Sequence, residues 1–349
     1  MRGLPIKSLL IKTARIAVGI GLLAYVLYAA NLFSDDGWQS LLKLVSSANL
    51  WWLIAALVFI PVMDMVSAIK WHFLTRQSGF TIGYWRLFVY YTVGRFFNMV
   101  LPSSIGGDVI RVHLLARTNK QYAKAAAVVF VERLTGVITL VVLAAVAVLF
   151  SLSAFHHRWL ELAILAAFAC LAIAIWFSLS DKPLAVLMKY LPSSNKFVNL
   201  GLKKAEKFKA ALSYFHSDHH IVIKTFGYSG FFYLFAVFNV WITALTFAPE
   251  AGFLTMIIAV PIIMFIMNIP VSIGGIGIME FAYTFTLTQL GYSSELAVAI
   301  ALLMRLKSII AAGIGAAIYP LVNSWGVTTE EILADVQPEN ATAGSSEKA

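Results

Sequence analysis

The sequence predicts an all-α polytopic membrane protein with about six full crossings and two re-entrant helical hairpins, arranged as an inverted-topology repeat. Hydrophobic residues make up 60% of the 349 positions and charged residues only 12%, which is far from the balance of a soluble domain. Apolar runs of about 20 residues, long enough to cross a bilayer, recur along the chain. A Pro-x-Ser-Ile-Gly-Gly motif occurs at positions 102–107 and again at 270–275.

Six segments are predicted to be full crossings because each is apolar over roughly the thickness of a bilayer. They are Thr13–Phe33, Leu50–Ile69, Ala125–Ser151, Trp159–Leu179, Ile221–Phe247 and Leu296–Pro320. The first follows a basic N-terminus, as the apolar part of a signal peptide does. No small-residue cleavage site precedes Asn31 and further spans follow, so we expect this segment to remain as the first helix.

Two shorter apolar segments run into the repeated motif, Leu87–Leu101 into its first copy and Phe253–Ile269 into its second. Proline and paired glycines break helices and leave backbone polar groups unpaired, and lipid cannot satisfy such groups. A short helical piece follows each motif, Asp108–Arg117 or Gly277–Leu290. We therefore expect each segment and its follower to form a hairpin that enters and leaves on one side of the membrane.

The distribution of basic residues predicts the orientation. The expected inner segments 1–15, 70–86, 111–124 and 181–224 contain 19 Lys and Arg, whereas the expected outer loops 34–49, 152–158, 248–252 and 291–295 contain 2. This bias places both termini in the cytoplasm. Because three crossings separate the two motifs, the hairpins are expected to enter from opposite faces, which is the sequence signature of an inverted-topology repeat.

We expect residues 1–323 to form one transmembrane transport domain. Its repeat halves cover roughly residues 50–180 and 221–323, and a basic amphipathic segment on the cytoplasmic surface, residues 181–220, joins them. Residues 324–349 are polar and rich in Glu, Ser and Ala, and we expect a disordered cytoplasmic tail there.

The residues around both motifs resemble the lysylphosphatidylglycerol synthase transmembrane-region family. The first block is Gly94-Arg95-Phe96-Phe97-Asn98, then Leu101 to Asp108 with Arg111 and Glu132-Arg133, and the second is Pro270 to Gly277 with Glu280 and Arg305. The resemblance covers about Ala14 to Tyr319. It implies a bacterial inner-membrane protein that moves aminoacylated or otherwise charged lipids between leaflets. The soluble synthase domain of the larger members has no counterpart here, so aminoacyl transfer is not expected.

Charged side chains inside the apolar segments carry the functional prediction, because a charge at a helix centre costs about 2.5–3.5 kcal/mol on insertion scales. An arginine can give a lipid phosphate two parallel hydrogen bonds and stays charged when desolvated. The acidic residues can pair with the arginines or receive a lipid ammonium, and the motif glycines allow backbone N–H groups to approach an anion. The predicted substrate-binding residues are Arg95, Ser104, Gly106, Gly107, Asp108, Arg111, Glu132, Arg133, Ser272, Gly274, Gly275, Glu280 and Arg305.

These observations favour a lipid flippase with a central polar cavity. Two alternatives stay open: a membrane transferase that uses Asp108 and Glu132 as acid–base groups, and a non-catalytic scaffold for lipid biosynthesis. Glu132 and Arg133 could also serve only as ion pairs within the bundle, and Arg111 could reach the inner interface. The sequence contains no nucleotide-binding motif, so we expect no enzyme activity, no cofactor and no metal. Phosphate-bearing lipids are the expected partners, a second copy or a biosynthetic protein remains open, and nucleic acid is not expected.

Overall fold

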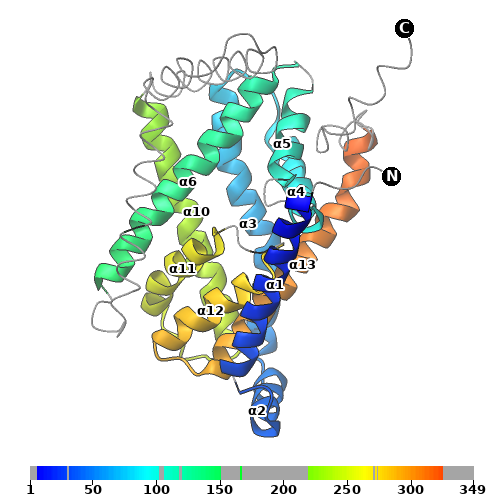
Figure 1. Cartoon of the computed structure of the whole chain (residues 1–349). Coiled ribbons are helices and arrows are strands. Elements are labelled where there is room, and N and C mark those ends of the chain that lie inside the picture. Colours follow the sequence, from blue (N-terminus) through cyan, green and yellow to red (C-terminus); the bar gives the residue numbers. More distant parts are fainter. Residues whose placement is uncertain are drawn as a thin grey trace.

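A computed structural model of the chain describes residues 6–29, 31–101, 106–117, 120–150, 166, 219–269, 272 and 274–324. Within these residues the protein consists of ten helices and contains no strand (Figure 1). The helices are α1 (Ile6–Ala29), α2 (Asp35–Ser46), α3 (Leu50–Gln77), α4 (Tyr84–Val100), α5 (Gly106–Ala116), α6 (Tyr122–Phe150), α10 (His219–Leu245), α11 (Phe253–Met267), α12 (Ile278–Gln289) and α13 (Ser294–Ser324). The all-helical prediction is confirmed for this part of the chain.

Four helices, α3, α6, α10 and α13, are long and apolar enough to cross a membrane. They coincide with four of the six predicted crossings. The apolar part of α1, Ile16–Ala29, is shorter than a full span. The predicted crossing Trp159–Leu179, apart from Ala166, lies outside the described residues, and so do most of the joining segment 181–220 and the tail from residue 325.

The chain is broken at both predicted places. Helix α4 ends just before the first motif and α5 begins within it, while α11 ends before the second motif and α12 begins after it. In the second break Gly274, Gly275 and Gly277 have φ angles of 61°, 71° and 83°, a left-handed conformation that glycine adopts without steric cost. In Figure 1, α4 and α5 lie toward the upper end of the molecule, and α11 and α12 lie toward the lower end.

Helices α3–α6 and α10–α13 pack in corresponding pairs. Helix α3 packs along α10. Helix α4 packs on α13, the last helix of the other set, and α11 correspondingly packs on α6. The short helices α5 and α12 each pack on the long helix that follows them, α6 and α13. The α4–α13 approach is close, because a Cβ atom on Gly315 would lie 2.4 Å from the carbonyl oxygen of Thr92. Each set contributes most of one apolar core. The core of the first set surrounds Trp71 and Leu74, and the core of the second surrounds Met256 and Ile263.

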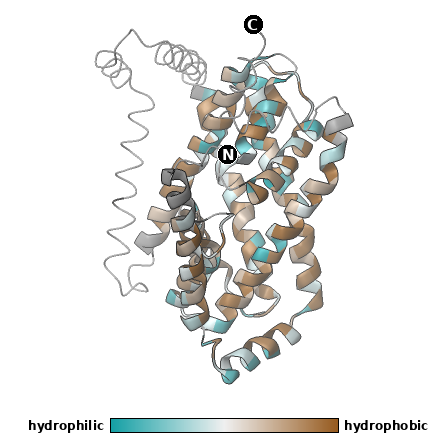
Figure 2. Cartoon of the chain, turned by 45° about the vertical axis from the view of Figure 1, so that its right-hand side comes forward, coloured by the Kyte–Doolittle hydropathy of each residue, from teal (hydrophilic) through white to brown (hydrophobic). Residues whose placement is uncertain are grey.

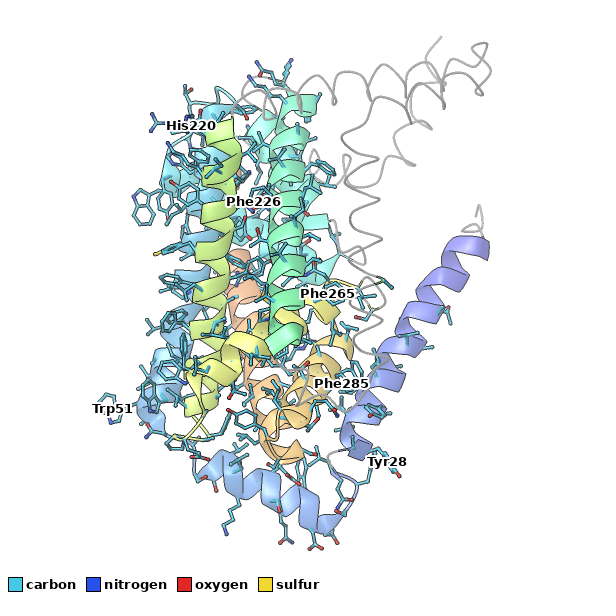
Figure 3. All side chains as sticks on the ribbon, turned by 90° about the vertical axis from the view of Figure 1, so that its left-hand side faces the viewer. Tyr28, Trp51, His220, Phe226, Phe265 and Phe285 are labelled. Atoms are coloured by element: carbon cyan, nitrogen blue, oxygen red, sulfur yellow. The ribbon has the colours of Figure 1, made fainter. Side chains whose placement is uncertain are left out.

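The surface of the bundle is largely apolar along its helices (Figure 2). Large side chains such as Tyr28 and Trp51 are 76% and 81% exposed and project outward near the same end of the molecule, opposite His220 (Figure 3). Aromatic residues at such positions are typical of membrane–water interfaces. Both observations agree with a protein surrounded by lipid.

Helix α2 lies in a segment that the sequence had indicated only as an outer loop. The Ser34 hydroxyl accepts a hydrogen bond from the Gly37 N–H at 3.2 Å, and Asp35 and Asp36 occupy the first turn, where acidic side chains favour a helix start. Trp38 and Leu42 remain exposed on α2. The helix is too short to cross a bilayer, so its formation leaves the predicted number of crossings unchanged.

Candidate functional site

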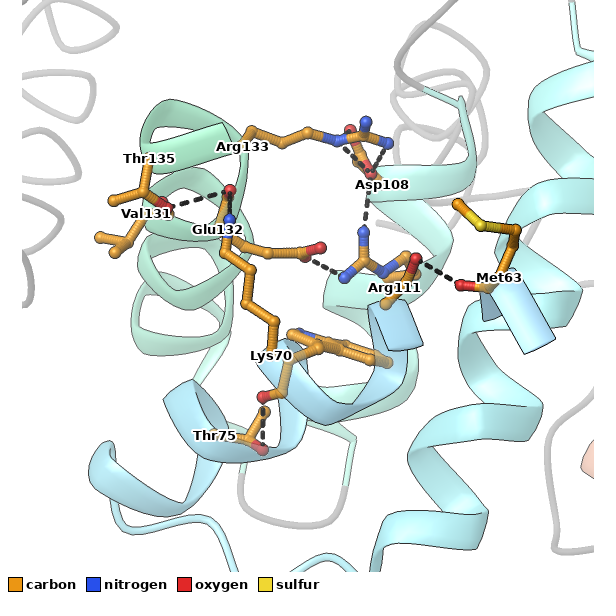
Figure 4. A network of polar contacts seen from close by, with 11 residues as sticks. Met63, Lys70, Thr75, Asp108, Arg111, Val131, Glu132, Arg133 and Thr135 are labelled. Atoms are coloured by element: carbon orange, nitrogen blue, oxygen red, sulfur yellow. Dashed lines mark hydrogen bonds and ion pairs between the residues drawn. The ribbon is translucent and has the colours of Figure 1, made fainter. Parts of the chain in front are cut away.

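Arg111 lies at the centre of a buried charge cluster between α3, α5 and α6 (Figure 4). Its side chain is 2% exposed, and its guanidinium stacks on the rings of Trp71 and Tyr91, at 4.2 and 4.5 Å from their centroids. It donates to the carboxylate of Glu132 and, at 3.3 Å, to Oδ1 of Asp108. Two carboxylates and two aromatic faces thus compensate this charge, so Arg111 acts as an internal cross-link.

Arg133 shares Asp108 with Arg111 but is far more accessible. Its Nε and Nη2 atoms donate to the two oxygens of Asp108, each at 2.9 Å, which is the two-pronged geometry of arginine with a carboxylate (Figure 4). The Arg133 side chain is 49% exposed, whereas that of Asp108 is 15% exposed. Much of the Arg133 side chain is therefore accessible.

Lys70 completes the first cluster, and the sequence analysis missed it. Its ammonium donates to the carbonyl oxygen of Glu132 at 2.7 Å, and the residue is 6% exposed. We had ended the crossing at Ile69 and counted Lys70 with an inner loop. Helix α3 instead continues to Gln77. The signal for that continuation was the apolar pair Trp71 and Leu74, with no glycine or proline between Ile69 and Gly79.

These charges open onto a cavity of about 130 Å³, which we call the first cavity. Lys70, Glu132 and Arg133 line it, together with polar groups from α4, α10 and the end of α11: Tyr91, Ser229, Tyr233 and Asn268. Lys70, Arg111 and Arg133 carry three positive charges against the two carboxylates of Asp108 and Glu132. The cluster therefore keeps a net positive charge, which makes the lining suitable for an anionic group.

Arg305 forms the corresponding cluster in the second set of helices, but its donors are occupied. Its Nε and Nη2 atoms donate to the Glu280 carboxylate at 2.6 and 3.0 Å, and Nη2 and Nη1 donate to the carbonyl oxygens of Gly275 and Gly274 at 2.6 and 3.2 Å. Glu280 in turn accepts the Gly277 N–H at 2.8 Å. Arg305 thereby satisfies backbone groups of the helix break that lipid could not satisfy.

The two clusters share one plan. Asp108 and Glu280 lie in the first turns of α5 and α12, and each pairs with an arginine 25 residues later on the following long helix. The difference lies in the carbonyls of the second break, which hold Arg305 and leave its side chain 14% exposed. Sequence spacing treated Arg133 and Arg305 alike, but their surroundings differ.

The motif glycines serve close packing. A Cβ atom on Gly107 would lie 2.0 Å from the carbonyl oxygen of Gly94, and one on Gly106 would lie 2.6 Å from the Leu101 side chain. The Gly107 N–H donates to Oδ1 of Asn98 at 2.8 Å. Its amide is therefore committed within the α4–α5 pair, whereas we had expected these amides to face an anion.

Two further predicted residues, Arg95 and Ser272, make no hydrogen bond or ion pair with the Arg111 cluster within the described structure. Arg95 pairs with the buried Asp64 of α3. The hydroxyl of Ser272 is buried and has no hydrogen-bond partner within the described structure. Ser104 lies outside the described residues.

Within the described part of the chain, no three His, Cys, Asp or Glu side chains are placed to hold a metal ion together. Comparison with curated proteins and with solved structures finds no match. The sequence profile of one family, described as the lysylphosphatidylglycerol synthase TM region, matches residues 13–315. That match includes both helix breaks, the Arg111 cluster and the Arg305 cluster. The chain therefore belongs to the lysylphosphatidylglycerol synthase transmembrane-region family.

Proposed function

We propose that this protein is a lipid flippase that moves a phosphate-bearing lipid between leaflets without changing it chemically. The observation that carries the proposal is the exposure of Arg133, which pairs with Asp108 yet is 49% exposed and lines a cavity within the membrane-spanning bundle. The side chains of Arg111 and Arg305 are only 2% and 14% exposed. Intramembrane charges that face a cavity mark substrate pathways by default. A phosphate can replace Asp108 on Arg133 with the same two-pronged geometry.

The energetic need for such a cavity is clear. A charged headgroup loses its hydration in hydrocarbon at a large cost, and the Lys70 ammonium, the Arg133 guanidinium and nearby hydroxyl groups can replace that water. The acyl chains would stay in the bilayer beside the largely apolar surface of the bundle. Asp108 would hold Arg133 in position between transport events.

We further propose that α4–α5 and α11–α12 are re-entrant hairpins of an inverted-topology repeat. Three observations support this: the corresponding helix pairs, the two ion pairs with a 25-residue separation, and the placement of the hairpins toward opposite ends in Figure 1. The breaks also approach each other, since a Cβ atom on Gly274 would lie 3.6 Å from the Met99 carbonyl oxygen. Such paired breaks surround transport sites in many transporters.

We place the protein in a bacterial inner membrane with both termini in the cytoplasm. The excess of Lys and Arg in the inner segments supports this orientation. Lys70 and Arg111 were counted in that excess although both are buried in the bundle. Removing them leaves 17 basic residues against 2, so the orientation does not depend on them.

The test is leaflet exchange in liposomes that contain the purified full chain and fluorescent lipids with anionic, zwitterionic or aminoacylated headgroups. We expect Arg133→Gln to slow exchange of the transported lipid by about 10–100-fold, because a hydrogen bond to a charged group contributes about 1.5–3 kcal/mol and about 1.4 kcal/mol corresponds to tenfold. The exposed Arg86 provides the matched control, Arg86→Gln, which should exchange at the wild-type rate. Exchange as slow as in protein-free vesicles for every headgroup would refute the function.

A further inference from the structure

A second cavity of about 250 Å³ lies among α3, α4 and α10–α13. None of the residues of the Arg111 cluster lines it. Lys307, Asn239 and Arg95 supply polar groups to it, and methionines make up much of the rest. Met264 of α11 lines both cavities. The second cavity is thus a neighbour of the first and has its own basic side chains.

Lys307 is a buried cation whose hydrogen-bond partners are neutral. The residue is 4% exposed, and its ammonium donates to Oδ1 of Asn239 and, at 2.9 Å, to the Thr243 hydroxyl. No ion pair joins Lys307 to an acidic side chain among the residues that the structure describes. An ammonium has three donors and is costly to bury without a counter-charge, so an anion bound in the cavity would favour the charged form of Lys307.

The two cavities occupy corresponding places in the two sets of helices. Lys70 lies on α3, and Asn239 lies on α10, the helix that packs along α3. Gly136 lies three residues after Arg133 on α6, and Ser308 lies three residues after Arg305 on α13. All four line a cavity, the first member of each pair the first cavity and the second member the second.

The lysine lies on a different helix in each set: on α3 at the first cavity and on α13 at the second. Thr135 lies two residues after Arg133 on α6, and Lys307 lies two residues after Arg305 on α13. In the first set, Lys70 and Thr135 both donate to the Glu132 carbonyl oxygen, at 2.7 and 3.2 Å, and in the second set Lys307 donates to Asn239. The α3–α6 pair and the α10–α13 pair therefore each contribute one lysine and one neutral polar residue, so each cavity has a basic side chain.

We propose that the second cavity is a further binding site for a phosphate group, with Lys307 as the cation that holds it. This inference rests on the proposed lipid transport and gives the transported headgroup a second station. Arg95, 31% exposed and paired with Asp64, offers another guanidinium to the same cavity. Met264 lines both cavities, and the flexible side chain of methionine suits a position that a headgroup must pass.

The experiment is native mass spectrometry of the full chain in detergent with dioctanoyl phosphatidylglycerol. We expect the wild type to bind up to two lipids, Lys307→Met one, Lys70→Met one, and the double variant none. Lys43 is an exposed lysine of α2, and the matched control Lys43→Met should bind two. Inorganic phosphate and dioctanoyl phosphatidylcholine are titrated as competitors. If only inorganic phosphate displaces the second bound lipid, the second cavity is a site for free anions. If only phosphatidylcholine displaces it, the second cavity is a site for lipid headgroups.

Two lipids still bound by Lys307→Met would overturn the second site. Folding is checked by thermal unfolding without lipid, where removal of a buried ammonium should leave Tm unchanged or raise it. Lys307→Gln gives a second variant that also removes the charge. Leaflet exchange separates this inference from the proposed function: exchange in a wild type that binds one lipid refutes only the second site, whereas two bound lipids without exchange refute only transport.

Discussion

Arg133 and Arg305 show how one residue type at equivalent positions acquires two roles. Both pair with a carboxylate in the first turn of a short helix. The left-handed glycines of the second break present two carbonyl oxygens that bind Arg305 as well. Arg305 therefore holds the break together, and Arg133, with a side chain 49% exposed, is the arginine that we propose contacts a ligand.

This difference predicts different consequences of the same substitution. Arg305→Gln should destabilise the fold by about 3–5 kcal/mol, because it leaves the buried Glu280 carboxylate uncompensated and removes donors from the carbonyls of Gly274 and Gly275. Arg133→Gln should lower Tm much less, because its partner Asp108 also binds Arg111. Thermal unfolding of the purified variants in detergent measures both. Equal Tm values for the two variants would contradict the assignment, and the double variant Arg305→Gln with Glu280→Gln should recover part of the loss.

At the scale of the elements, the broken segments depend on close contact between helix backbones. Gly107 of α5 faces the Gly94 carbonyl oxygen of α4. Gly315 of α13 faces the Thr92 carbonyl oxygen, which also belongs to α4. Small residues allow membrane helices to approach in this way. The α4–α5 pair is held further by the hydrogen bond from the Gly107 amide to Asn98. The motif glycines therefore position the helix that carries Asp108 and Arg111.

Gly107→Ala should sharply reduce the yield of folded protein, because its Cβ would lie 2.0 Å from the Gly94 carbonyl oxygen and backbone must shift. Gly227 of α10 provides the matched control, since among the described residues a Cβ atom there would have no neighbour within 4 Å apart from its own stretch of helix. Gly227→Ala should fold like the wild type or slightly better, because alanine favours a helix over glycine by about 1 kcal/mol. Size-exclusion chromatography in detergent distinguishes the variants, and a monodisperse Gly107→Ala protein would argue against the close approach.

At the scale of the whole molecule, the proposed hairpins fix which loops share a side of the membrane. If α4–α5 is re-entrant, Arg86 in the first turn of α4 and Lys120 after α5 lie on one side. If α11–α12 is re-entrant, Glu250 and Ser293 lie together on the other. The exposed Lys43 of α2 should share the side of Glu250.

Single cysteines at these five positions test the arrangement in a background in which Cys170, the single cysteine of the sequence, is replaced by serine. We expect a membrane-impermeant maleimide to label positions 43, 250 and 293 in intact bacteria, and positions 86 and 120 only after the cells are opened. Labelling of positions 86 and 120 from opposite sides would show that the first segment crosses the membrane fully. Labelling of every position before lysis would instead indicate leaky cells, which a cytosolic control protein detects.

Much of the architecture could be predicted from local pattern. Apolar length identified α3, α6, α10 and α13, and Pro and Gly located both breaks, because these features act through the backbone and the hydrophobic effect at each position. Helix α2 was missed because its pattern is amphipathic and short. Lys70 was missed because a charged residue next to an apolar run resembles the end of a span, whereas α3 continues past it.

The sequence by itself determined that this chain is a helical membrane protein with two interrupted segments and several intramembrane charges. Only the tertiary structure decided which charges pair: Arg111 between two rings and two carboxylates, Arg305 on the glycine carbonyls, and Arg133 and Lys307 on separate cavities. The physical reason is that burial and pairing depend on side chains that meet from distant helices. Spacing along one helix determines which face of that helix a charged side chain occupies. The neighbouring helices determine which partners surround it.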